Sequence, residues 1–244
     1  MKKWLVNIPI RFILHLILKL DISELKKIPP TGGFLVVVNH VNFLDVPVVI
    51  THLQPKRTTG LIKKETWENP LMAFLFNAWE GIPIDRETAD FTAFQKAKDA
   101  LDANRILAIA PEGTRTEDGC LIRGKPGIAM LAIKTNVPIF PIAYFGHEDF
   151  KLNFMKFRRT PMKIHVGKPF KINLRGQLKN KEVMQTVTDS IMLEIAALMP
   201  EKYHGYYQSL MPERGKFIDY LDRLAGEQVA EPFRKQPPQP EVTA

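Results

Sequence analysis

The sequence contains a single cysteine, Cys120, among its 244 residues. One cysteine excludes an internal disulfide framework and suits a reducing compartment. Cys120 has no matched histidine nearby, so we assign it no catalytic role. The sequence also lacks a cluster of residues with metal-ligand spacing and lacks a redox motif, so it implies no metal and no cofactor.

Acidic residues are missing from one long segment. Between positions 151 and 181 there is no Asp or Glu, whereas the rest of the chain has 24 basic and 26 acidic residues, so the net charge of +8 belongs to this segment. A localised positive patch indicates an anionic partner: nucleic acid, an anionic membrane or an acidic carrier protein. A solvated surface that aids solubility is the alternative. The basic residues are Lys151, Lys156, Arg158, Arg159, Lys163, Lys168, Lys171, Arg175, Lys179 and Lys181.

An apolar run long enough to cross a membrane is also missing from the N-terminal region. As a helix, residues 8–20 would extend about 20 Å, short of the roughly 30 Å hydrocarbon core of a bilayer. A secretory signal peptide is disfavoured, because charges interrupt the apolar stretch and no small-x-small cleavage site follows. Residues 1–28 are nevertheless rich in Leu, Ile, Val and Phe.

The polar residues of this N-terminal region recur at every fourth position. A step of four leaves only about 40° of drift around a helix, so they form one winding stripe. We expect an amphipathic helix that begins near Pro9 and lies in one leaflet, with Lys and Arg at the headgroups and Trp4 at the interface. The alternative is a helix packed on the protein's own core. The stripe consists of Lys3, Asn7, Arg11, His15 and Lys19.

Beyond this N-terminal membrane-associating segment (1–28), strand-like and helix-like runs alternate. This pattern predicts an α/β domain over 29–229, with a mixed, largely parallel sheet flanked by helices. The proline-rich residues 230–244 predict a disordered tail. The expected strands are 34–38, 58–62, 105–110, 138–145 and 162–167, and the expected helices are 42–53, 65–79, 88–103, 124–135 and 180–199.

His40 and Asp45 directly follow the apolar run 34–38. With Asn42 as the N-cap of a helix, Asp45 falls in the first turn and can reach back to His40. Asp45 would then hold one ring nitrogen of His40 and leave the other free to accept a proton. The alternative is an Asp45 that only caps the helix and favours its dipole.

Three further segments carry candidate functional groups. Pro111-Glu112-Gly113-Thr114-Arg115 follows a strand, where Gly113 permits a tight turn and Arg115 suits a phosphate. The stretch 81–86 is a short strand that ends in Arg86, a second phosphate-competent group. The prolines of 137–142 favour an edge or irregular strand, which can line an acyl groove or pack in the core.

In order and spacing, these blocks resemble the four motifs of the 1-acylglycerol-3-phosphate acyltransferase family. The motifs are represented by Asn39-His40…Asp45, Gly81…Arg86, Glu112-Gly113-Thr114-Arg115 and Val137-Pro138-Ile139-Phe140-Pro141. Two positions depart from the family pattern: Asn42, where Ser is frequent, and Pro83, where Phe or an aliphatic residue is frequent.

The resemblance implies transfer of a fatty acyl group from acyl-CoA or acyl-carrier protein to the sn-2 hydroxyl of 1-acylglycerol-3-phosphate, which gives phosphatidic acid. It implies a general-base dyad of His40 and Asp45 without a covalent acyl-enzyme. Phosphate binding would fall to Arg86, Glu112, Gly113, Thr114, Arg115 and Lys63, with Lys125 a weaker candidate, and Glu112 would hold the loop or a glycerol hydroxyl. Val137, Pro138, Ile139 and Pro141 would line the acyl groove.

Taken together, these features predict a monotopic enzyme on the cytoplasmic face of the cell membrane. The expected partners are a lysophospholipid, an acyl-CoA or acyl-carrier protein and an anionic membrane surface, but no nucleic acid. The alternatives are a different lysophospholipid or glycolipid acceptor, hydrolysis by an activated water, and a non-catalytic lipid-binding protein. The helix-like run 65–79 is a further candidate for shaping an acyl tunnel.

Overall fold

The computed structural model describes residues 3–53, 57–86, 88 and 90–221. The predicted proline-rich tail, 230–244, lies outside the described residues. A nine-stranded sheet runs through the molecule, with strand order β1-β7-β6-β2-β5-β3-β4 and with β8 and β9 joined beside β6. The strands are β1 (Leu18–Leu20), β2 (Phe34–Val38), β3 (Thr58–Lys63), β4 (Ile82–Ile84), β5 (Ile106–Ile109), β6 (Ile139–Phe145), β7 (Thr160–Val166), β8 (Phe170–Ile172) and β9 (Ile218–Tyr220).

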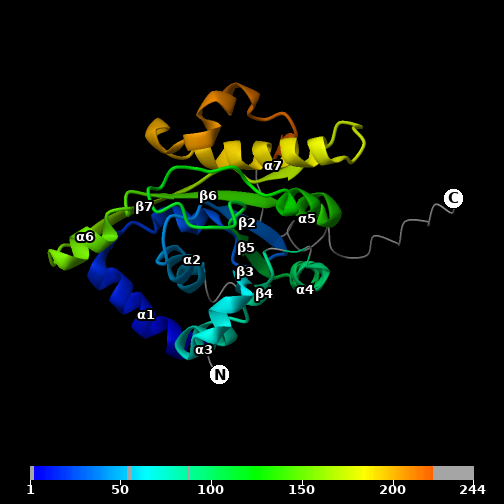
Figure 1. Cartoon of the computed structure of the whole chain (residues 1–244). Helices are drawn as coiled ribbons and strands as arrows, with labels where there is room; N and C mark the ends of the chain where they lie inside the picture. Colours follow the sequence, from blue (N-terminus) through cyan, green and yellow to red (C-terminus); the bar gives the residue numbers. More distant parts are fainter. Residues whose placement is uncertain (1–2, 54–56, 87, 89, 222–244) are drawn as a thin grey trace.

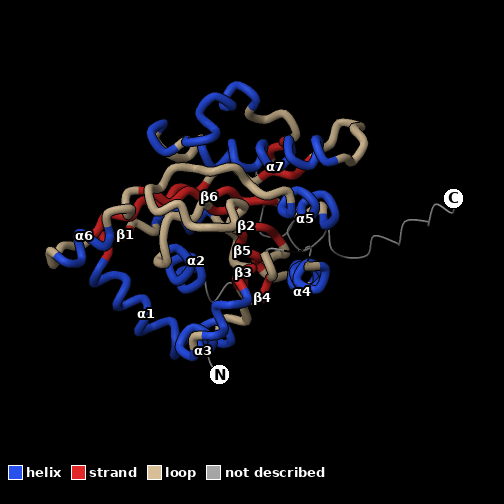
Figure 2. The backbone as a smooth tube through the Cα atoms, in the orientation of Figure 1, coloured by secondary structure: helices blue, strands red, loops and turns tan. Residues whose placement is uncertain are grey.

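Most neighbouring strands run parallel, as the sequence predicts. The antiparallel pairs are β6–β7, β6–β8 and β8–β9. Helices cover both faces of the sheet (Figures 1 and 2). They are α1 (Lys3–Ile17), α2 (Asp45–Leu53), α3 (Pro70–Ala78), α4 (Phe91–Asp102), α5 (Gly127–Thr135), α6 (Phe150–Met155) and α7 (Lys181–Ala196), with 3₁₀ turns η1 (Ser23–Lys27), η2 (Lys64–Glu68), η3 (Glu201–Tyr203) and η4 (Gly205–Glu213).

The buried strands separate two apolar cores because successive side chains point to opposite faces. Leu35 and Val37 of β2 pack with α4, α5 and α7, whereas Phe34, Val36 and Val38 pack with α1, α2 and α3. Since β2 lies between two parallel neighbours and is covered on both sides, all five of its residues are buried, as expected for a central parallel strand.

The strand 138–145 is not the edge strand that its prolines favour. β6 lies inside the sheet between β2 and β7. The Pro141 carbonyl accepts from the N–H of Gly167 at 2.9 Å, and Gly167 lies just beyond the end of β7. In a strand the N–H and the carbonyl of one residue point to the same side, so the N–H that Pro141 lacks would also face Gly167. Pro141 is tolerated because the ladder with β7 stops there. A single ladder hydrogen bond is lost, and the strand continues to Phe145.

Two predicted helices also differ from the structure. The run 65–79 is divided into η2 and α3, because the Asn69 side chain accepts from the N–H groups of Leu71 and Met72 and starts a new helix before Pro70. Near the N-terminus, α1 begins at Lys3 rather than near Pro9, and β1 and the short 3₁₀ helix η1 follow it.

Helix α1 contacts the protein through a mixed face, on which part of its polar stripe lies beside the buried apolar side chains of Val6 and Leu14. Asn7 is buried and accepts a hydrogen bond from the indole N–H of Trp79 at 2.9 Å. The Nε of Arg11 donates to the Thr51 carbonyl at 2.9 Å, and His15 packs against His52. The opposite face of α1 exposes five large apolar side chains: Leu5, Ile8, Phe12, Ile13 and Leu16. The prediction that Arg11 reaches outward to headgroups is therefore wrong.

The basic segment 151–181 does not form one patch. It starts in α6 and ends at the first turn of α7, and Figure 1 shows α6 and the beginning of α7 at opposite sides of the molecule. Strands β7 and β8 lie between the two ends of the segment. Both run antiparallel to β6, so together they carry the chain across the sheet, away from α6. The α6 end combines Lys151, Lys156, Arg158 and Arg159 with the exposed apolar side chains of Leu152, Phe154, Met155 and Phe157.

Candidate active site

The parallel strands bring the candidate motifs to one edge of the sheet. β5 and β6 flank β2 on its two sides, and β3 and β4 follow beyond β5, all parallel to β2. The loops at their carboxyl ends therefore open at the same edge, where ligands bind in α/β folds. The loop after β2 supplies His40, the loop after β4 supplies Arg86 and the loop after β5 supplies Glu112.

Asn39 ends β2 by continuing the ladder with its side chain. Its amide donates to the Tyr144 carbonyl at 2.8 Å, and its oxygen accepts from the Tyr144 N–H at 2.7 Å. A buried backbone needs such partners when the strand pairing ends. This anchor fixes where the chain leaves the sheet, and hence where His40 begins.

His40 and Asp45 meet as predicted. The Nδ1 of His40 lies 2.8 Å from Oδ2 of Asp45, and both residues are buried. The local geometry differs from the prediction: α2 begins at Asp45, and the Asn42 side chain accepts from Leu44 rather than capping α2. Asp45 reaches His40 because its Oδ2 also accepts from the N–H groups of Val41 and Asn42, at 2.7 and 3.0 Å. The loop thus folds around the carboxylate.

A second histidine binds the same carboxylate. The Nε2 of His147 lies 2.5 Å from Oδ1 of Asp45, and His147 is completely buried. Burial raises the pKa of Asp45, but hydrogen bonds from His147 and His40 outweigh this effect and hold the pKa below its ordinary value. Asp45 is therefore an ionised carboxylate with donors on both oxygens. No group of residues in the described part of the chain has a metal-binding arrangement.

Sequence reasoning missed His147. It stands two residues beyond β6, and the prolines led us to expect an edge strand there rather than a neighbour of β2. With β6 recognised as parallel to β2, the residues after Phe145 come to the same edge as His40. The usable signal was therefore the apolar character of the whole run 139–145, which is typical of a buried strand.

Glu112 holds the His40 loop from behind. Its Oε2 accepts from the backbone N–H of His40 at 2.7 Å, and its Oε1 accepts from the N–H of Ile122 at 3.0 Å. Burial raises the pKa of Glu112 to about 7, and the nearby charge of Asp45 adds to this rise. Of the two roles open from sequence, these contacts correspond to holding the loop. The backbone N–H of Thr116 donates to the His40 carbonyl at 3.0 Å and ties the same loops together.

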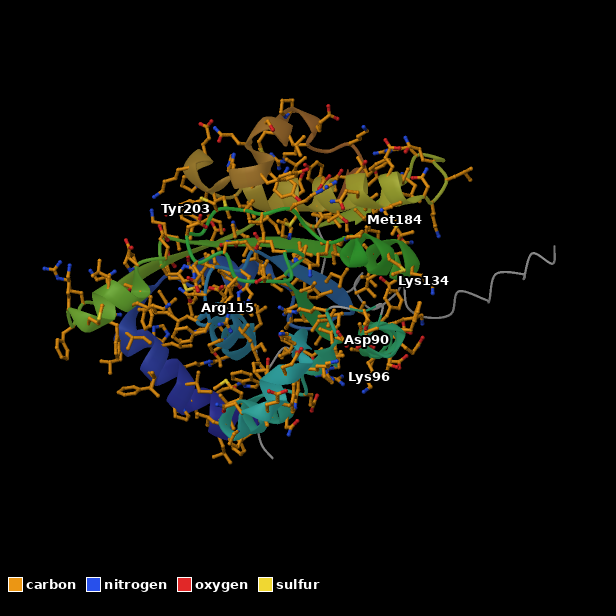
Figure 3. All side chains as sticks on the ribbon, viewed as in Figure 1. Asp90, Lys96, Arg115, Lys134, Met184 and Tyr203 are labelled. Carbon is orange, nitrogen blue, oxygen red and sulfur yellow. The ribbon has the colours of Figure 1, made fainter. Side chains whose placement is uncertain are left out.

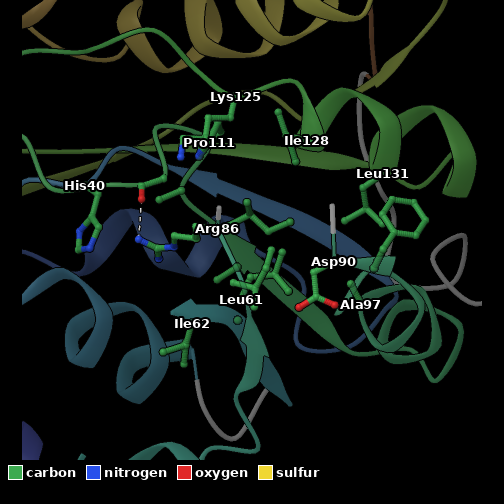
Figure 4. Close-up of a pocket in the computed structure, with 18 of the residues that line it drawn as sticks. His40, Leu61, Ile62, Arg86, Asp90, Ala97, Pro111, Lys125, Ile128 and Leu131 are labelled. Carbon is green, nitrogen blue, oxygen red and sulfur yellow. Dashed lines mark hydrogen bonds between the residues drawn. The ribbon is translucent and has the colours of Figure 1, made fainter. Parts of the chain in front are cut away.

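Cationic groups gather around Gly113. The Nη1 of Arg86 donates to the Gly113 carbonyl at 2.6 Å (Figure 4), and burial, followed by the charge of Arg115, lowers the pKa of Arg86. Gly113 has a φ of 70°, and a Cβ at this position would lie 3.1 Å from the Lys125 side chain. A larger residue would therefore crowd this loop. Among the described residues, Arg86, Arg115 and Lys125 form no ion pair with a carboxylate.

Other predicted site residues lie differently. Thr114 is exposed on the loop beside Arg115. Lys63 ends β3 opposite Ile84 of β4, is exposed and pairs with Glu65 at 3.4 Å, and the charge of Glu65 acts in turn on Arg86. Val137 and Ile139 are buried in the apolar core beside α5 and α7. The Pro138 carbonyl accepts from the N–H of Leu35, and Pro141 lies opposite Val37 of β2. The expected groove along 137–141 is therefore wrong, because this strand is inside the sheet.

An apolar cavity of about 350 Å³ opens beside His40 instead. It extends between α4 and α5, with Arg86 and Lys125 near His40 and with Ala97 and Leu131 farther in (Figure 4). Asp90 and Lys134, which also line it, lie well away from Arg115 (Figure 3). Leu71, Phe74, Leu75 and Trp79 do not line the cavity. Leu71 and Phe74 are exposed on α3, and Trp79 packs against α1.

The arrangement can perform acid–base chemistry on a hydroxyl beside an anion. The Nε2 of His40 is the ring nitrogen that Asp45 does not hold, and His40 borders the cavity. A base in this position takes a proton from a hydroxyl, and the ionised Asp45 stabilises the resulting imidazolium. The cationic cluster offers planar donors for a phosphate.

Comparison with known proteins confirms the resemblance. A 1-acyl-sn-glycerol-3-phosphate acyltransferase of Bacillus subtilis is 27% identical over 174 residues, which cover 71% of this chain and 84% of that protein. An enzyme of the same name from Cocos nucifera is 31% identical over 140 residues, or 55% of this chain and 45% of that protein. The chain thus spans less than half of the plant relative.

The fold also has a solved counterpart. The crystal structure of the 1-acyl-sn-glycerophosphate acyltransferase PlsC from Thermotoga maritima matches with a TM-score of 0.53 at 21% identity, over 71% of this chain and 68% of that one. At 21% identity this match shows similarity of the fold alone. The family model named Acyltransferase matches residues 19–145, which hold all four motifs complete. Since this match covers more than half of the chain, the protein belongs to the acyltransferase family.

Proposed function

We propose that the protein is a 1-acyl-sn-glycerol-3-phosphate acyltransferase that forms phosphatidic acid. The observation that carries this proposal is the convergence of a His40–Asp45 base, a cationic cluster and an apolar cavity at one sheet edge. A base, a phosphate site and an apolar cavity are the three features that a lysophosphatidate and a fatty acyl thioester require. The names of the curated relatives support the same substrate class.

In this mechanism His40 takes the proton of the sn-2 hydroxyl while the hydroxyl oxygen attacks the thioester carbonyl. Asp45 orients the imidazole through Nδ1 and stabilises the imidazolium. His40 then returns the proton to the departing thiolate, so no covalent acyl-enzyme forms. Holding both substrates in one orientation supplies much of the rate.

Arg86 and Arg115 bind the acceptor phosphate. Arg86 is fixed by the Gly113 carbonyl, and burial, followed by repulsion from the charge of Arg115, lowers the pKa of Arg86. A phosphate between the two would relieve this repulsion. Lys125 is placed to join them, since its side chain lies against Gly113. The cavity between α4 and α5 accommodates an acyl chain, because its lining is mostly apolar.

The same proposal places the enzyme on the membrane surface as a monotopic protein. No helix in the described part of the chain has the length and hydropathy for a span. The apolar outer face of α1 and the exposed apolar residues of α6 suit insertion into one leaflet, and the exposed Lys151, Lys156 and Arg158 at the α6 end suit anionic headgroups. Figure 1 shows α1 and α6 side by side, away from α7.

Turnover with defined substrates tests the proposal. Purified protein in anionic vesicles should convert lysophosphatidate and labelled acyl-CoA or acyl-carrier protein into phosphatidic acid. The His40→Ala variant should lose about two to four orders of magnitude in kcat, the contribution of a general base, and should keep its thermal melting temperature. Release of free fatty acid as the main product would indicate hydrolysis. Lipid binding without turnover would indicate a non-catalytic lipid-binding protein.

A further inference from the structure

His147 is a buried histidine that the mechanism above does not use. It is completely buried, and its Nε2 lies 2.5 Å from Oδ1 of Asp45. Two contacts place it: β6 pairs with β2 in parallel register, and the Asn42 side-chain amide donates to the His147 carbonyl at 3.0 Å. The residue thus joins the β6 loop to the loop that carries His40.

The geometry fixes how His147 is protonated. An ionised carboxylate only accepts hydrogen bonds, so Nε2 of His147 carries the hydrogen that it donates to Asp45. Its Nδ1 is buried and has no hydrogen-bond partner among the described residues. One ring nitrogen of His147 therefore donates to Asp45, and the other has no hydrogen-bond partner among the described residues.

The two oxygens of Asp45 are supported unequally. Oδ2 receives three donors: His40 Nδ1, Val41 N and Asn42 N. Oδ1 receives only the His147 donor among the described contacts. Without His147, Oδ1 would be a buried acceptor without a partner, which is a costly arrangement. Rotating the carboxylate to share the remaining donors would relieve this cost, but it would turn Oδ2 away from His40.

We propose that His147 is a positioning residue for acyl transfer, which fixes the plane of the Asp45 carboxylate so that Oδ2 stays aligned with Nδ1 of His40. This inference rests on the proposed function, because its readout is turnover of lysophosphatidate. His147 does not line the cavity and has no place for substrate. Its effect reaches the reaction through Asp45 and then His40, in the manner of groups that orient catalytic ligands from behind.

A series of three variants tests this role. The side-chain amide nitrogen of Gln can stand where Nε2 of His stands, whereas that of Asn corresponds to Nδ1 and does not reach Asp45. His147→Phe and His147→Asn should each reduce kcat by about tenfold to a hundredfold, the usual range for such outer contacts. His147→Gln should restore most of the rate. The KM for lysophosphatidate should stay within twofold of the unaltered enzyme in all three.

The pH profile distinguishes positioning from packing. The acidic limb of kcat/KM reports protonation of the free enzyme's base. A misaligned Asp45 supports the His40 imidazolium less, so the midpoint of this limb should move to lower pH in the Phe and Asn variants and return in the Gln variant. Glu112 and Tyr144, the other titratable groups whose charges interact with Asp45, are unchanged in every variant, so their contributions cancel in the comparison.

His204→Phe is the matched control. His204 is also buried, its Nε2 contacts only the Met199 carbonyl at 3.1 Å, and its Nδ1 likewise has no described partner. This variant should alter thermal stability but leave the pH profile unmoved. Full activity in His147→Phe would overturn the inference, as would an equal loss in the Asn and Gln variants with an unmoved limb. An inactive unaltered enzyme would instead contradict the proposed function, so the two failures are distinguishable.

Discussion

Buried polar groups have different effects at the carboxyl edge of the sheet and on helix α1. At the sheet edge, polar side chains turn inward to surround one carboxylate, and every oxygen of Asp45 and Glu112 has a donor. On α1, polar side chains also turn inward, but their effect is to leave large apolar side chains outside. The first region holds a buried charge among hydrogen-bond donors, whereas the second leaves an apolar surface exposed.

This difference shows that amphipathicity alone does not indicate which face of a helix meets the protein. In water, the apolar face packs inward and the polar face is solvated. Asn7 and Arg11 instead bind Trp79 and the Thr51 carbonyl, and Arg159 donates to the carbonyls of His15 and Leu18 at the end of the helix. The helix is thus held by these hydrogen bonds together with the buried apolar side chains of Val6 and Leu14, while Phe12 is 70% exposed.

The largest effect should come from Asp45→Asn at the sheet edge. Both oxygens of Asp45 accept hydrogen bonds, from ring N–H groups or backbone N–H groups. In the Asn variant an NH₂ group replaces one of these oxygens and would face a group that also donates. The hydrogen bonds around the carboxylate therefore cannot all be kept. We expect kcat to fall by about three to four orders of magnitude, as when the orienting carboxylate of a histidine base is neutralised. Steady-state turnover and circular dichroism measure this. A loss smaller than tenfold in a folded variant would show that Asp45 is a structural cap.

Glu112 should make the stability of the same region depend on pH. Its pKa is raised to about 7 from an ordinary 4.5, so between these values the folded protein binds more protons than the unfolded chain. The free energy of unfolding therefore falls as pH rises through this window, by up to about 3 kcal/mol. Urea unfolding at pH 5 and pH 8 should show a smaller fall for Glu112→Gln than for the unaltered protein. Equal falls in both proteins would contradict this role.

Arg86 and Lys63 provide a matched pair of cations at the sheet edge. Arg86→Ala should raise the KM for lysophosphatidate by about tenfold to a hundredfold, because a hydrogen bond to a charged group contributes about 1.5–3 kcal/mol. Lys63→Ala should change the KM less than twofold, since Lys63 is exposed and pairs with Glu65. Equal effects of the two substitutions would place the phosphate between β3 and β4 instead.

Much of the sheet edge could be predicted from the sequence because its motifs are local. His40 and Asp45 are five positions apart and meet within one loop, and the five main strands follow from apolar runs. The role of β6 could not be read from its sequence, because the prolines disfavour an interior strand unless the missing donor falls beyond a neighbouring strand's end. His147 was missed for the same reason, since its contact with Asp45 depends on a strand order that only the fold reveals.

The N-terminal helix could be predicted as an element but not in its orientation. Its polar stripe is visible from spacing, yet the partners of that stripe, Trp79 and Thr51, are far away in the sequence. The same holds for the acyl cavity. Whether 65–79 or the pair α4 and α5 encloses a chain depends on which faces of these helices meet, and apolar core positions look alike in both.

The smallest effects should separate the two faces of α1. Phe12→Ser removes an exposed aromatic side chain whose burial contributes roughly 1.5–3 kcal/mol, so binding to anionic vesicles should weaken by about tenfold or more while the melting temperature stays unchanged. Asn7→Leu leaves the indole N–H of Trp79 without a partner, at a cost of about 1–3 kcal/mol in the free energy of unfolding, and should leave the outward face intact. Vesicle sedimentation and urea unfolding of both variants give the four values needed. If Phe12→Ser destabilised the fold and bound vesicles normally, the outward face of α1 would be a protein contact, and the contrast with the sheet edge would disappear.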